Sequence, residues 1–234
     1  MSKNQGGLHT ITAGDVFMKV AITCQRGRIP ANYIRWIKQA GFEPVVISRM
    51  RDLRRLQGAE GILFSGGGDL WPYFYSSEKI GDDFDLYRDI LEYSVFQQRG
   101  DRGILGICRG MQIINVFLGG TLTDIAEPRM HSGEKFHFIQ TAASSRLRRI
   151  LGAQPRVNSA HHQAIARLAP SLAIAAYCRS VPEAAEGEKL LLVQFHPERM
   201  NSRQLGRYWK EQLALCRKDS KKTDILTDGS EHIL

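Results

Sequence analysis

One short run near the middle of the chain constrains the fold more than any other feature. Residues 103–112, GILGICRGMQ, have the pattern of a short apolar strand that ends in Gly-x-Cys-x-Gly, and an amphipathic run from Met111 to Leu118 follows directly. This pattern is typical of a strand–turn–helix nucleophile elbow in which the sulfur of Cys108 replaces a serine hydroxyl. The flanking glycines would let the backbone adopt a strained turn that a Cβ obstructs.

The elbow places Cys108 at the start of a helix. There, the unpaired backbone amides and the positive end of the helix dipole favour thiolate over thiol. The alternative is a buried cysteine in a tight strand–helix turn, because free cysteine is often a small core residue. The glycine spacing alone does not decide between a nucleophile and a core residue.

Strand and helix patterns alternate around this run. Strands separated by helices predict a parallel sheet with helices on both faces. We expect the strands at Lys19–Thr23, Pro44–Ile47, Gly61–Phe64 and Gly103–Ile107, and the helices at Ile29–Ala40, Leu53–Leu56 and Phe84–Gln98. After about residue 121 the pattern turns to shorter strands, which we expect at Lys135–Thr141, Arg156–Ser159, Leu172–Cys178 and Lys189–Phe195.

The pattern fits a single domain. A chain of 234 residues with 43% hydrophobic residues can bury one sizeable core. We expect residues 1–17 to be a disordered N-terminal extension and residues 18–217 to be one catalytic domain that ends in a helix over Asn201–Arg217. We expect residues 218–234, which are polar and charged, to form a disordered tail.

Charge and cysteine content narrow the class of protein. The formal net charge is +8, but the basic residues are dispersed and lack interleaved aromatics, so they favour a solvated surface over a nucleic-acid interface. The four cysteines are far apart and form no CxxC pair. No signal segment and no apolar run near the roughly 20 residues that span a bilayer is present. We therefore expect a cytoplasmic protein, in a compartment that keeps thiols reduced, with no membrane or nucleic-acid partner.

A second motif follows the last apolar strand. His196-Pro197-Glu198 comes directly after residues 190–195, LLLVQF. In a parallel sheet the chemistry collects beyond the carboxyl ends of the strands, so His196 is expected near Cys108. An imidazole can hold the thiolate and deliver a proton to a leaving group, and Glu198 can fix its orientation. The sequence thus predicts a Cys108–His196–Glu198 triad, with a plain turn as the alternative for the last motif.

A glycine-rich loop, residues 65–69 (SGGGD), follows the third strand. It lacks the Gly-Lys-Ser/Thr ending of a phosphate-binding P-loop. Amides of Gly67 or Gly68, together with the amide of Arg109, could instead stabilise a tetrahedral oxyanion. A tight turn without catalytic function is the alternative.

Together these motifs resemble a known family. They are Ser65–Asp69 (SGGGD), Gly106–Gln112 (GICRGMQ), Gly119–Leu122 (GGTL), Val157–Ala164 (VNSAHHQA) and Val193–Glu198 (VQFHPE). In this order they resemble the class I glutamine amidotransferase superfamily over residues 18–217. The 157–164 segment favours its stand-alone γ-glutamyl hydrolase branch, of the peptidase C26 type. The resemblance implies a flavodoxin-like three-layer α/β/α sandwich with a mostly parallel central sheet, the Cys-His-Glu triad and the oxyanion hole.

The resemblance also implies a reaction. Cys108 would attack a small γ-glutamyl substrate and form a γ-glutamyl thioester, which water hydrolyses without a cofactor. Asp69 and Gln112 are candidate contacts to the glutamyl group, as are His161 and His162, of which one would line the pocket and the other would be structural. Paired histidines can bind a metal, but no third ligand at suitable spacing accompanies them, so we expect none.

Other functions remain open. The same triad would serve a glutaminase subunit that supplies ammonia to a separate synthetase partner, and a degenerate binding protein could keep the fold without catalysis. Residues 179–184 (RSVPEA) depart from the Asp-Gly turn usual before Ile-Glu-Ala in this family, and the segment after Trp71-Pro72-Tyr73 is compressed. Both stretches would shape the leaving-group side of the pocket, so the amine is not identified. Self-association into a homo-oligomer is also left open.

Overall fold

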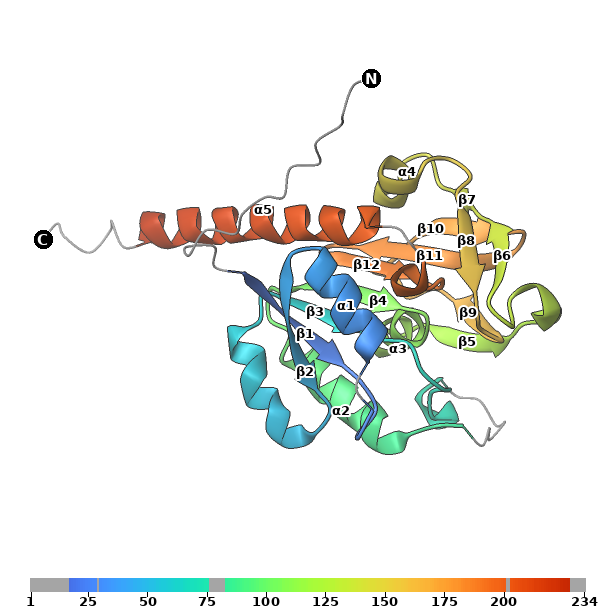
Figure 1. Cartoon of the computed structure of the whole chain (residues 1–234), viewed down its shortest axis with the longest axis horizontal. Helices are drawn as coiled ribbons and strands as arrows, with labels where there is room; N and C mark the ends of the chain where they lie inside the picture. The colour runs from blue at the N-terminus through green and yellow to red at the C-terminus, as the bar shows by residue number, and fades with distance from the viewer. Residues whose placement is uncertain (1–16, 29, 76–82, 201–202, 228–234) are drawn as a thin grey trace, which may run out of the picture.

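An eight-stranded sheet forms the centre of the molecule (Figure 1). The computed structural model describes residues 17–28, 30–75, 83–200 and 203–227. The strand order is β2-β1-β3-β4-β12-β11-β10-β7. The parallel strands are β2 (Phe42–Ile47), β1 (Met18–Thr23), β3 (Gly61–Phe64), β4 (Gly103–Ile107) and β12 (Leu190–Val193). The antiparallel strands are β11 (Val181–Gly187), β10 (Ala173–Cys178) and β7 (Gln140–Thr141).

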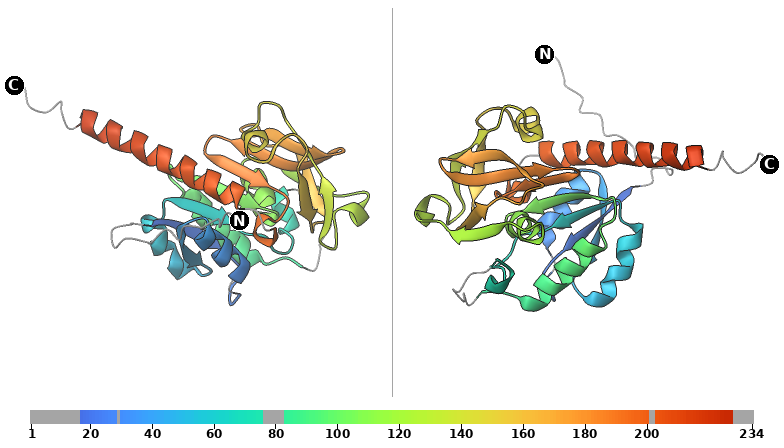
Figure 2. Two further views of the ribbon diagram at one scale, coloured as in Figure 1. Left: turned by 45° about the horizontal axis from the view of Figure 1, so that its top comes forward. Right: turned by 180° about the vertical axis from the view of Figure 1, so that it is seen from behind.

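Helices cover both faces of the sheet, as the two turned views in Figure 2 show. One face carries α1 (Ala31–Gln39), α4 (Arg146–Leu151) and α5 (Gln204–Thr227). The other carries η1 (Met50–Gly58), α2 (Leu86–Gln97) and α3 (Arg109–Phe117). Two apolar clusters fill the spaces between the layers: Trp36 and Trp209 lie in the first, Leu91 and Ile113 in the second. The predicted three-layer α/β/α sandwich with a mostly parallel central sheet is therefore confirmed.

The central strands are apolar because both of their faces are covered. All residues of β3 and β4 are buried, which is the environment that makes parallel strands continuous apolar runs rather than alternating ones. β3 and β12 pair on either side of β4, with Phe64 opposite Gly106 and Val193 opposite Ile107. The three segments that follow these strands consequently emerge side by side at one edge of the sheet.

A smaller lobe adjoins that edge. It contains two antiparallel pairs, β5 (Thr121–Asp124) with β9 (Gln163–Arg167) and β6 (Lys135–Phe138) with β8 (Arg156–Ser159). Short 3-10 helices complete the fold: η2 (Pro72–Tyr75), η3 (Pro128–Met130) and η4 (Pro197–Arg199).

The structure differs from the sequence-based boundaries in several places. The expected strand 135–141 is divided into β6 and β7, which join different sheets, and β5, β9 and β11 were not expected. Helix α5 continues to Thr227 and projects past the sheet, so residues 218–227 are helical where a disordered tail was expected (Figure 1). The expected disorder of 1–16 and 228–234 lies outside the described residues. No helix in the described ranges is both long and apolar enough to cross a membrane.

Candidate active site

Cys108 occupies a strained turn between β4 and α3. Its φ of 52° and ψ of −108° place a residue with a Cβ in backbone space that only glycine enters readily. Its amide donates to the Val193 carbonyl at 2.8 Å, which fixes the turn against the neighbouring strand. The flanking glycines have a different role from the expected one. A Cβ on Gly110 would lie 2.0 Å from the Phe64 carbonyl oxygen, and one on Gly106 would lie 2.8 Å from the Gly110 carbonyl oxygen. They permit close packing, while Cys108 itself carries the strained conformation.

The sheet brings His196 and Glu198 to this turn. The Nδ1 atom of His196 lies 2.8 Å from Oε1 of Glu198, and the imidazole is close enough to Cys108 to lower the pKa of its thiol. Asn158 holds the histidine backbone on both sides, since its amide group donates to the His196 carbonyl at 3.1 Å and accepts from the His196 N–H at 2.9 Å. The structure therefore brings Cys108, His196 and Glu198 close together.

Electrostatics favour a charged cysteine–histidine pair. Burial opposes ionisation of Cys108, but the positive charge and hydrogen bond of His196 outweigh it, so the pKa of the thiol lies below its ordinary value. Burial likewise disfavours the charged imidazole, but Cys108 and Glu198 raise the pKa of His196 to about 9. Both shifts therefore favour the form of the pair in which Cys108 is a thiolate and His196 an imidazolium.

The glycine-rich loop lies directly against this pair. The Gly66 amide donates to the hydroxyl of Tyr33 at 2.9 Å, and the Asp69 amide donates to the Asp83 carbonyl at 2.8 Å. The candidate oxyanion donors Gly67 and Gly68 lie between these two anchors, with Gly67 exposed to solvent. The backbone amide of Arg109, the next residue, also contributes to lowering the pKa of the Cys108 thiol.

Gly66 is a close-approach position that the sequence did not single out. A Cβ there would lie 2.9 Å from Cε1 of His196 and 3.6 Å from Cβ of Cys108. Only glycine therefore lets the loop pass this close to the cysteine–histidine pair.

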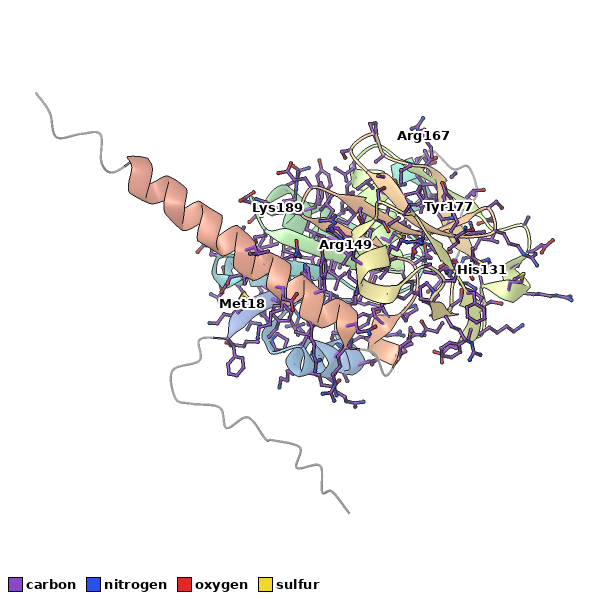
Figure 3. The ribbon with its side chains drawn as sticks, turned by 90° about the horizontal axis from the view of Figure 1, so that it is seen from above. Met18, His131, Arg149, Arg167, Tyr177 and Lys189 are labelled. Atoms are coloured by element: carbon purple, nitrogen blue, oxygen red, sulfur yellow. The ribbon has the colours of Figure 1, made fainter. Side chains whose placement is uncertain are left out.

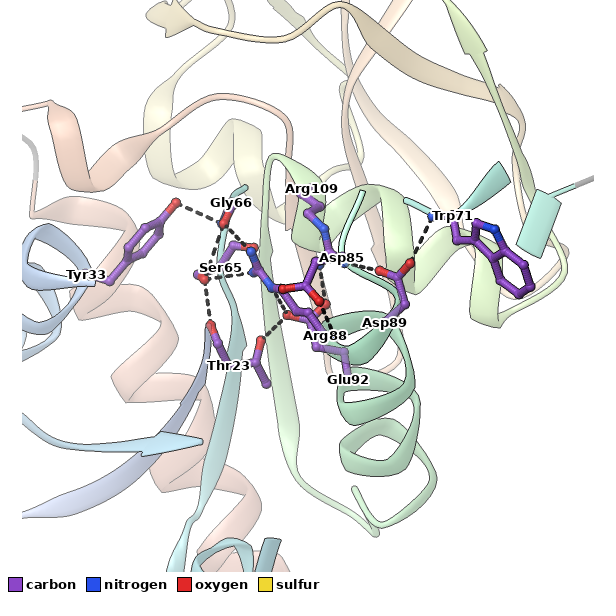
Figure 4. A network of polar contacts seen from close by, with 10 residues as sticks. All are labelled: Thr23, Tyr33, Ser65, Gly66, Trp71, Asp85, Arg88, Asp89, Glu92 and Arg109. Carbon is purple, nitrogen blue, oxygen red and sulfur yellow. Dashed lines mark hydrogen bonds and ion pairs between the residues drawn. The ribbon is translucent and has the colours of Figure 1, made fainter. Parts of the chain in front are cut away.

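A buried set of charges, which we call the arginine–carboxylate network, contacts both the glycine-rich loop and Arg109, the residue after Cys108 (Figure 4). Its members are Arg88, Asp89, Glu92 and Arg109. The Arg109 guanidinium pairs with Asp89 and Glu92 of α2. Arg88 donates to Glu92 at 3.0 Å and to the carbonyls of Ser65 and Gly66 at 2.8 and 3.1 Å.

The network has a clear electrostatic balance. Burial opposes the charge of Glu92, but the two guanidinium groups hold its pKa below the ordinary value. Through these contacts the network fixes the loop that bears Gly67 and Gly68 and the residue that follows Cys108.

The predicted substrate contacts fall into two groups. Asp69 and His162 meet at the surface, with Nε2 of His162 3.1 Å from the Asp69 carboxylate. Gln112 is buried and donates to the Gln163 carbonyl at 3.0 Å. His161 is also buried, and its Nδ1 lies 3.0 Å from the same carbonyl. The structure thus leaves Asp69 and His162 accessible, whereas Gln112 and His161 are buried.

Some supporting residues were not found from the sequence. Gln194 is fully buried with its Nε2 3.5 Å from the sulfur of Cys108, and the hydroxyl of Tyr33 lies 3.4 Å from Nδ1 of His196. A signal for Gln194 was present, because it is a polar residue inside an apolar strand run. Arg88 and Glu92 had only the i,i+4 spacing of an ordinary surface helix pair, which gives no hint that both are buried.

Comparisons with known proteins point to one family. The profile of the peptidase C26 family matches residues 11–198. A Mycobacterium tuberculosis protein provisionally named as a glutamine amidotransferase is 33% identical over 194 residues, which cover 74% of this chain and 63% of that protein, less than two thirds of its length. One subunit of the glutamine-hydrolysing GMP synthase of Pyrococcus abyssi is 30% identical over 173 residues, which cover 70% of this chain and 80% of that protein.

Solved structures share the fold. A Thermoplasma acidophilum protein provisionally named as a GMP synthase subunit has a TM-score of 0.69 at 18% identity and covers 89% of this chain and 98% of its own. A glutamine amidotransferase from Thermotoga maritima has a TM-score of 0.60 at 14% identity, with coverage of 92% and 90%. The fold is therefore that of class I glutamine amidotransferases.

Proposed function

The chain belongs to the peptidase C26 family of class I glutamine amidotransferase-like hydrolases, and we propose that it cleaves the γ-glutamyl amide bond of a small γ-glutamyl conjugate. The products would be glutamate and an amine. The observation that carries this proposal is the elbow cysteine. Cys108 combines a positive φ, a helix N-terminus and a nearby His196 that lowers the pKa of its thiol, and Glu198 orients that histidine. This arrangement suits acyl transfer through a thiolate.

In the first step, the Cys108 thiolate attacks the δ-carbonyl carbon of the substrate. The negative charge that develops on the carbonyl oxygen is stabilised by the Arg109 amide together with an amide of Gly67 or Gly68. The C–N bond then breaks, and the electron pair leaves with the amine. The imidazolium of His196 protonates this amine, so the products of the step are a γ-glutamyl thioester and a neutral imidazole.

In the second step, water hydrolyses the thioester. Neutral His196 removes a proton from the water as it attacks, and the same amides stabilise the second oxyanion. The C–S bond breaks, glutamate leaves, and the thiolate–imidazolium pair is restored. Throughout, Glu198 accepts from Nδ1 of His196, which keeps Nε2 directed at the reacting atoms.

The four candidate substrate contacts differ in accessibility, and we assign them different roles on that basis. Asp69 and His162 are accessible and come from two different loops, so they are the residues we propose to contact the glutamyl group. Gln112 and His161 are held by the same backbone carbonyl of Gln163, and we assign them supporting positions.

A glutaminase subunit is the second candidate function. The observation that favours it is the 30% identity to the Pyrococcus abyssi GMP synthase subunit over 80% of the length of that protein. The same triad chemistry would then act on glutamine, and the ammonia would pass to a separate synthetase. Activity on free glutamine that depends on an added partner would distinguish this function from the stand-alone hydrolase.

Glutamate release by the purified chain from a panel of γ-glutamyl amides, glutamine included, tests the proposal. We expect hydrolysis of at least one conjugate and no turnover by Cys108→Ala. Cys24→Ala is the matched control, because Cys24 is another buried free cysteine whose pKa burial raises to about 11, and it should retain wild-type activity. Wild-type activity in Cys108→Ala would refute the assignment of the nucleophile.

A further inference from the structure

Three histidines surround a buried carboxylate in the smaller lobe, next to the candidate active site. The Oε1 atom of Glu183 lies 3.1 Å from Nδ1 of His131, 3.3 Å from Nε2 of His137 and 3.5 Å from Nε2 of His161. Glu183 is fully buried, and each histidine is at least nine-tenths buried. We call these four residues the histidine–glutamate cluster.

The cluster is poor in hydrogen bonds for groups so deeply buried. Among the described residues, both carboxylate oxygens of Glu183, both ring nitrogens of His137 and Nε2 of His161 have no hydrogen-bond partner. Buried polar atoms of native proteins are nearly always satisfied, and exceptions call for an ion, a water or a functional reason. The ring nitrogens are close enough to the carboxylate for an ion pair but are not aligned for hydrogen bonds.

The orientation of His161 adds a second, independent observation. Its Nδ1 lies 3.0 Å from the Gln163 carbonyl oxygen, and because a carbonyl only accepts, Nδ1 must carry the proton. The lone pair of neutral His161 is then on Nε2, which faces Glu183. A histidine that donates one ring N–H to a backbone carbonyl and directs the other nitrogen at a cation is the usual arrangement of a metal ligand.

We propose that the histidine–glutamate cluster binds one divalent transition-metal ion, of the zinc class, through His131, His161 and Glu183. Imidazole and carboxylate are ligands that zinc accepts. Metal–ligand distances of about 2.0–2.1 Å in a tetrahedron correspond to ligand-to-ligand distances of about 3.3–3.4 Å. The separations between the Glu183 carboxylate and the imidazole nitrogens, 3.1 Å for His131 and 3.5 Å for His161, bracket that value. The ligand atoms of His131, His161 and Glu183 also all lie within 4.8 Å of one another.

Three protein ligands leave the fourth position of a tetrahedral ion for a water or for His137, which lies 3.3 Å from the Glu183 carboxylate. Its three ligands come from the residue after η3, from the loop between β8 and β9, and from β11. The ion would therefore tie together parts of the lobe that are distant in sequence. It would also fix the loop that presents His162 beside the glycine-rich loop. Figure 3 shows His131 on the side of the molecule opposite the projecting end of α5.

A cavity adjoins the cluster at His131. Its volume is about 220 Å³, and its lining also includes Cys178. Cys178 also offers an alternative set of ligands, because its sulfur lies within 4.8 Å of ligand atoms of His131 and His137. The experiment must therefore distinguish the carboxylate-centred set from the thiol-centred one.

The test is the metal content and cobalt spectrum of the full-length chain, purified without a histidine tag. We expect about one zinc per chain by plasma mass spectrometry. After chelation, added Co²⁺ should give the visible absorption of a tetrahedral ion, and added Zn²⁺ should raise the unfolding temperature. Glu183→Gln should bind the metal at least about 10- to 100-fold more weakly, since even loss of an outer hydrogen-bond partner has an effect of this size.

Two control variants make the result decisive. His162→Asn removes the exposed histidine next to His161 in the chain and should keep full metal content. Cys178→Ser should keep it as well, and loss of metal from Cys178→Ser but not from Glu183→Gln would overturn this ligand assignment. Because Glu183→Gln could fail to fold, the wild-type titration stands alone: if Zn²⁺ and Co²⁺ neither bind nor shift the unfolding temperature, the site does not exist.

Discussion

Two buried charged clusters flank Cys108, and they differ in how many of their charged groups are hydrogen-bonded. In the arginine–carboxylate network each charged group faces an opposite charge with hydrogen bonds, and further bonds reach the backbone of the glycine-rich loop. In the histidine–glutamate cluster the only carboxylate accepts no hydrogen bond from the described residues. Burial of charged groups alone therefore does not identify a ligand site; the lack of hydrogen-bond partners is the additional signal. The charges of the arginine–carboxylate network are already paired, so the network needs no bound ion. The histidine–glutamate cluster instead has the composition of an incomplete metal coordination shell.

The largest effect is expected from breaking the complete network. Glu92→Ala would leave Arg88 and Arg109 buried without that carboxylate, and removal of one partner from a buried ion pair costs about 3–5 kcal/mol of unfolding free energy. Urea denaturation measures the loss, which should be the same with zinc or with chelator. The control is Glu127→Ala, because that carboxylate is exposed and its pair with Arg179 is weak. If Glu92→Ala lost unfolding free energy only in the presence of zinc, the arginine–carboxylate network would not be independent of the metal, contrary to our expectation.

The next effect concerns catalysis. Arg88→Met should release the Ser65 and Gly66 carbonyls and displace the candidate oxyanion amides. We expect kcat to fall by about 10²–10³, the usual consequence of losing an oxyanion donor, with a smaller change in KM. Arg99→Met is the matched control, since Arg99 packs on Phe96 at the far end of α2. Equal kcat values in the two variants would show that the network is structural only.

The pH dependence of activity tests Cys108, His196 and Glu198 independently of the two buried clusters. Activity should rise with pH as Cys108 ionises, at a pH below the ordinary thiol value, and fall as His196 loses its proton near pH 9. Glu198 stabilises the protonated imidazole, so Glu198→Gln should lower the pKa of His196 towards its ordinary value of 6.5. The alkaline limb of kcat/KM should then move to lower pH, with or without chelator. An unmoved limb would mean that Glu198 does not act on His196.

The smallest effect is expected at Tyr33. Its hydroxyl accepts the Gly66 N–H at 2.9 Å, so Tyr33→Phe leaves that donor unpaired at a cost of about 1 kcal/mol. Thermal unfolding measures the change beside Tyr93→Phe, an exposed tyrosine for which no loss is expected. A loss as large as that of Glu92→Ala would place Tyr33 within the essential network.

The sequence predicted the parallel half of the sheet well, because its signals are local. The strand β4, the turn at Cys108 and the start of α3 are encoded in ten consecutive residues. Strand β11 was missed for equally local reasons. Pro182 argues against a strand, and the preceding turn has Arg179 at a φ of 54°, where glycine or asparagine would have signalled a hairpin.

Both buried clusters escaped prediction because their contacts are not local. Arg109 meets its carboxylates across 17 and 20 positions of sequence, and Glu183 meets histidines from three other segments. The paired histidines were noticed, but their partners on η3, β6 and β11 come together only through the tertiary fold. A ligand spacing along the sequence therefore could not indicate that these residues lie together.

The central claim is that Cys108 carries the acyl group during turnover. The most direct measurement is mass spectrometry of the enzyme quenched in acid while it hydrolyses a γ-glutamyl amide. The account predicts a γ-glutamyl adduct on the peptide that contains Cys108, in the wild type and in Cys24→Ala but not in Cys108→Ala. Continued hydrolysis with the adduct on another residue would contradict the account, as would rapid turnover by Cys108→Ala.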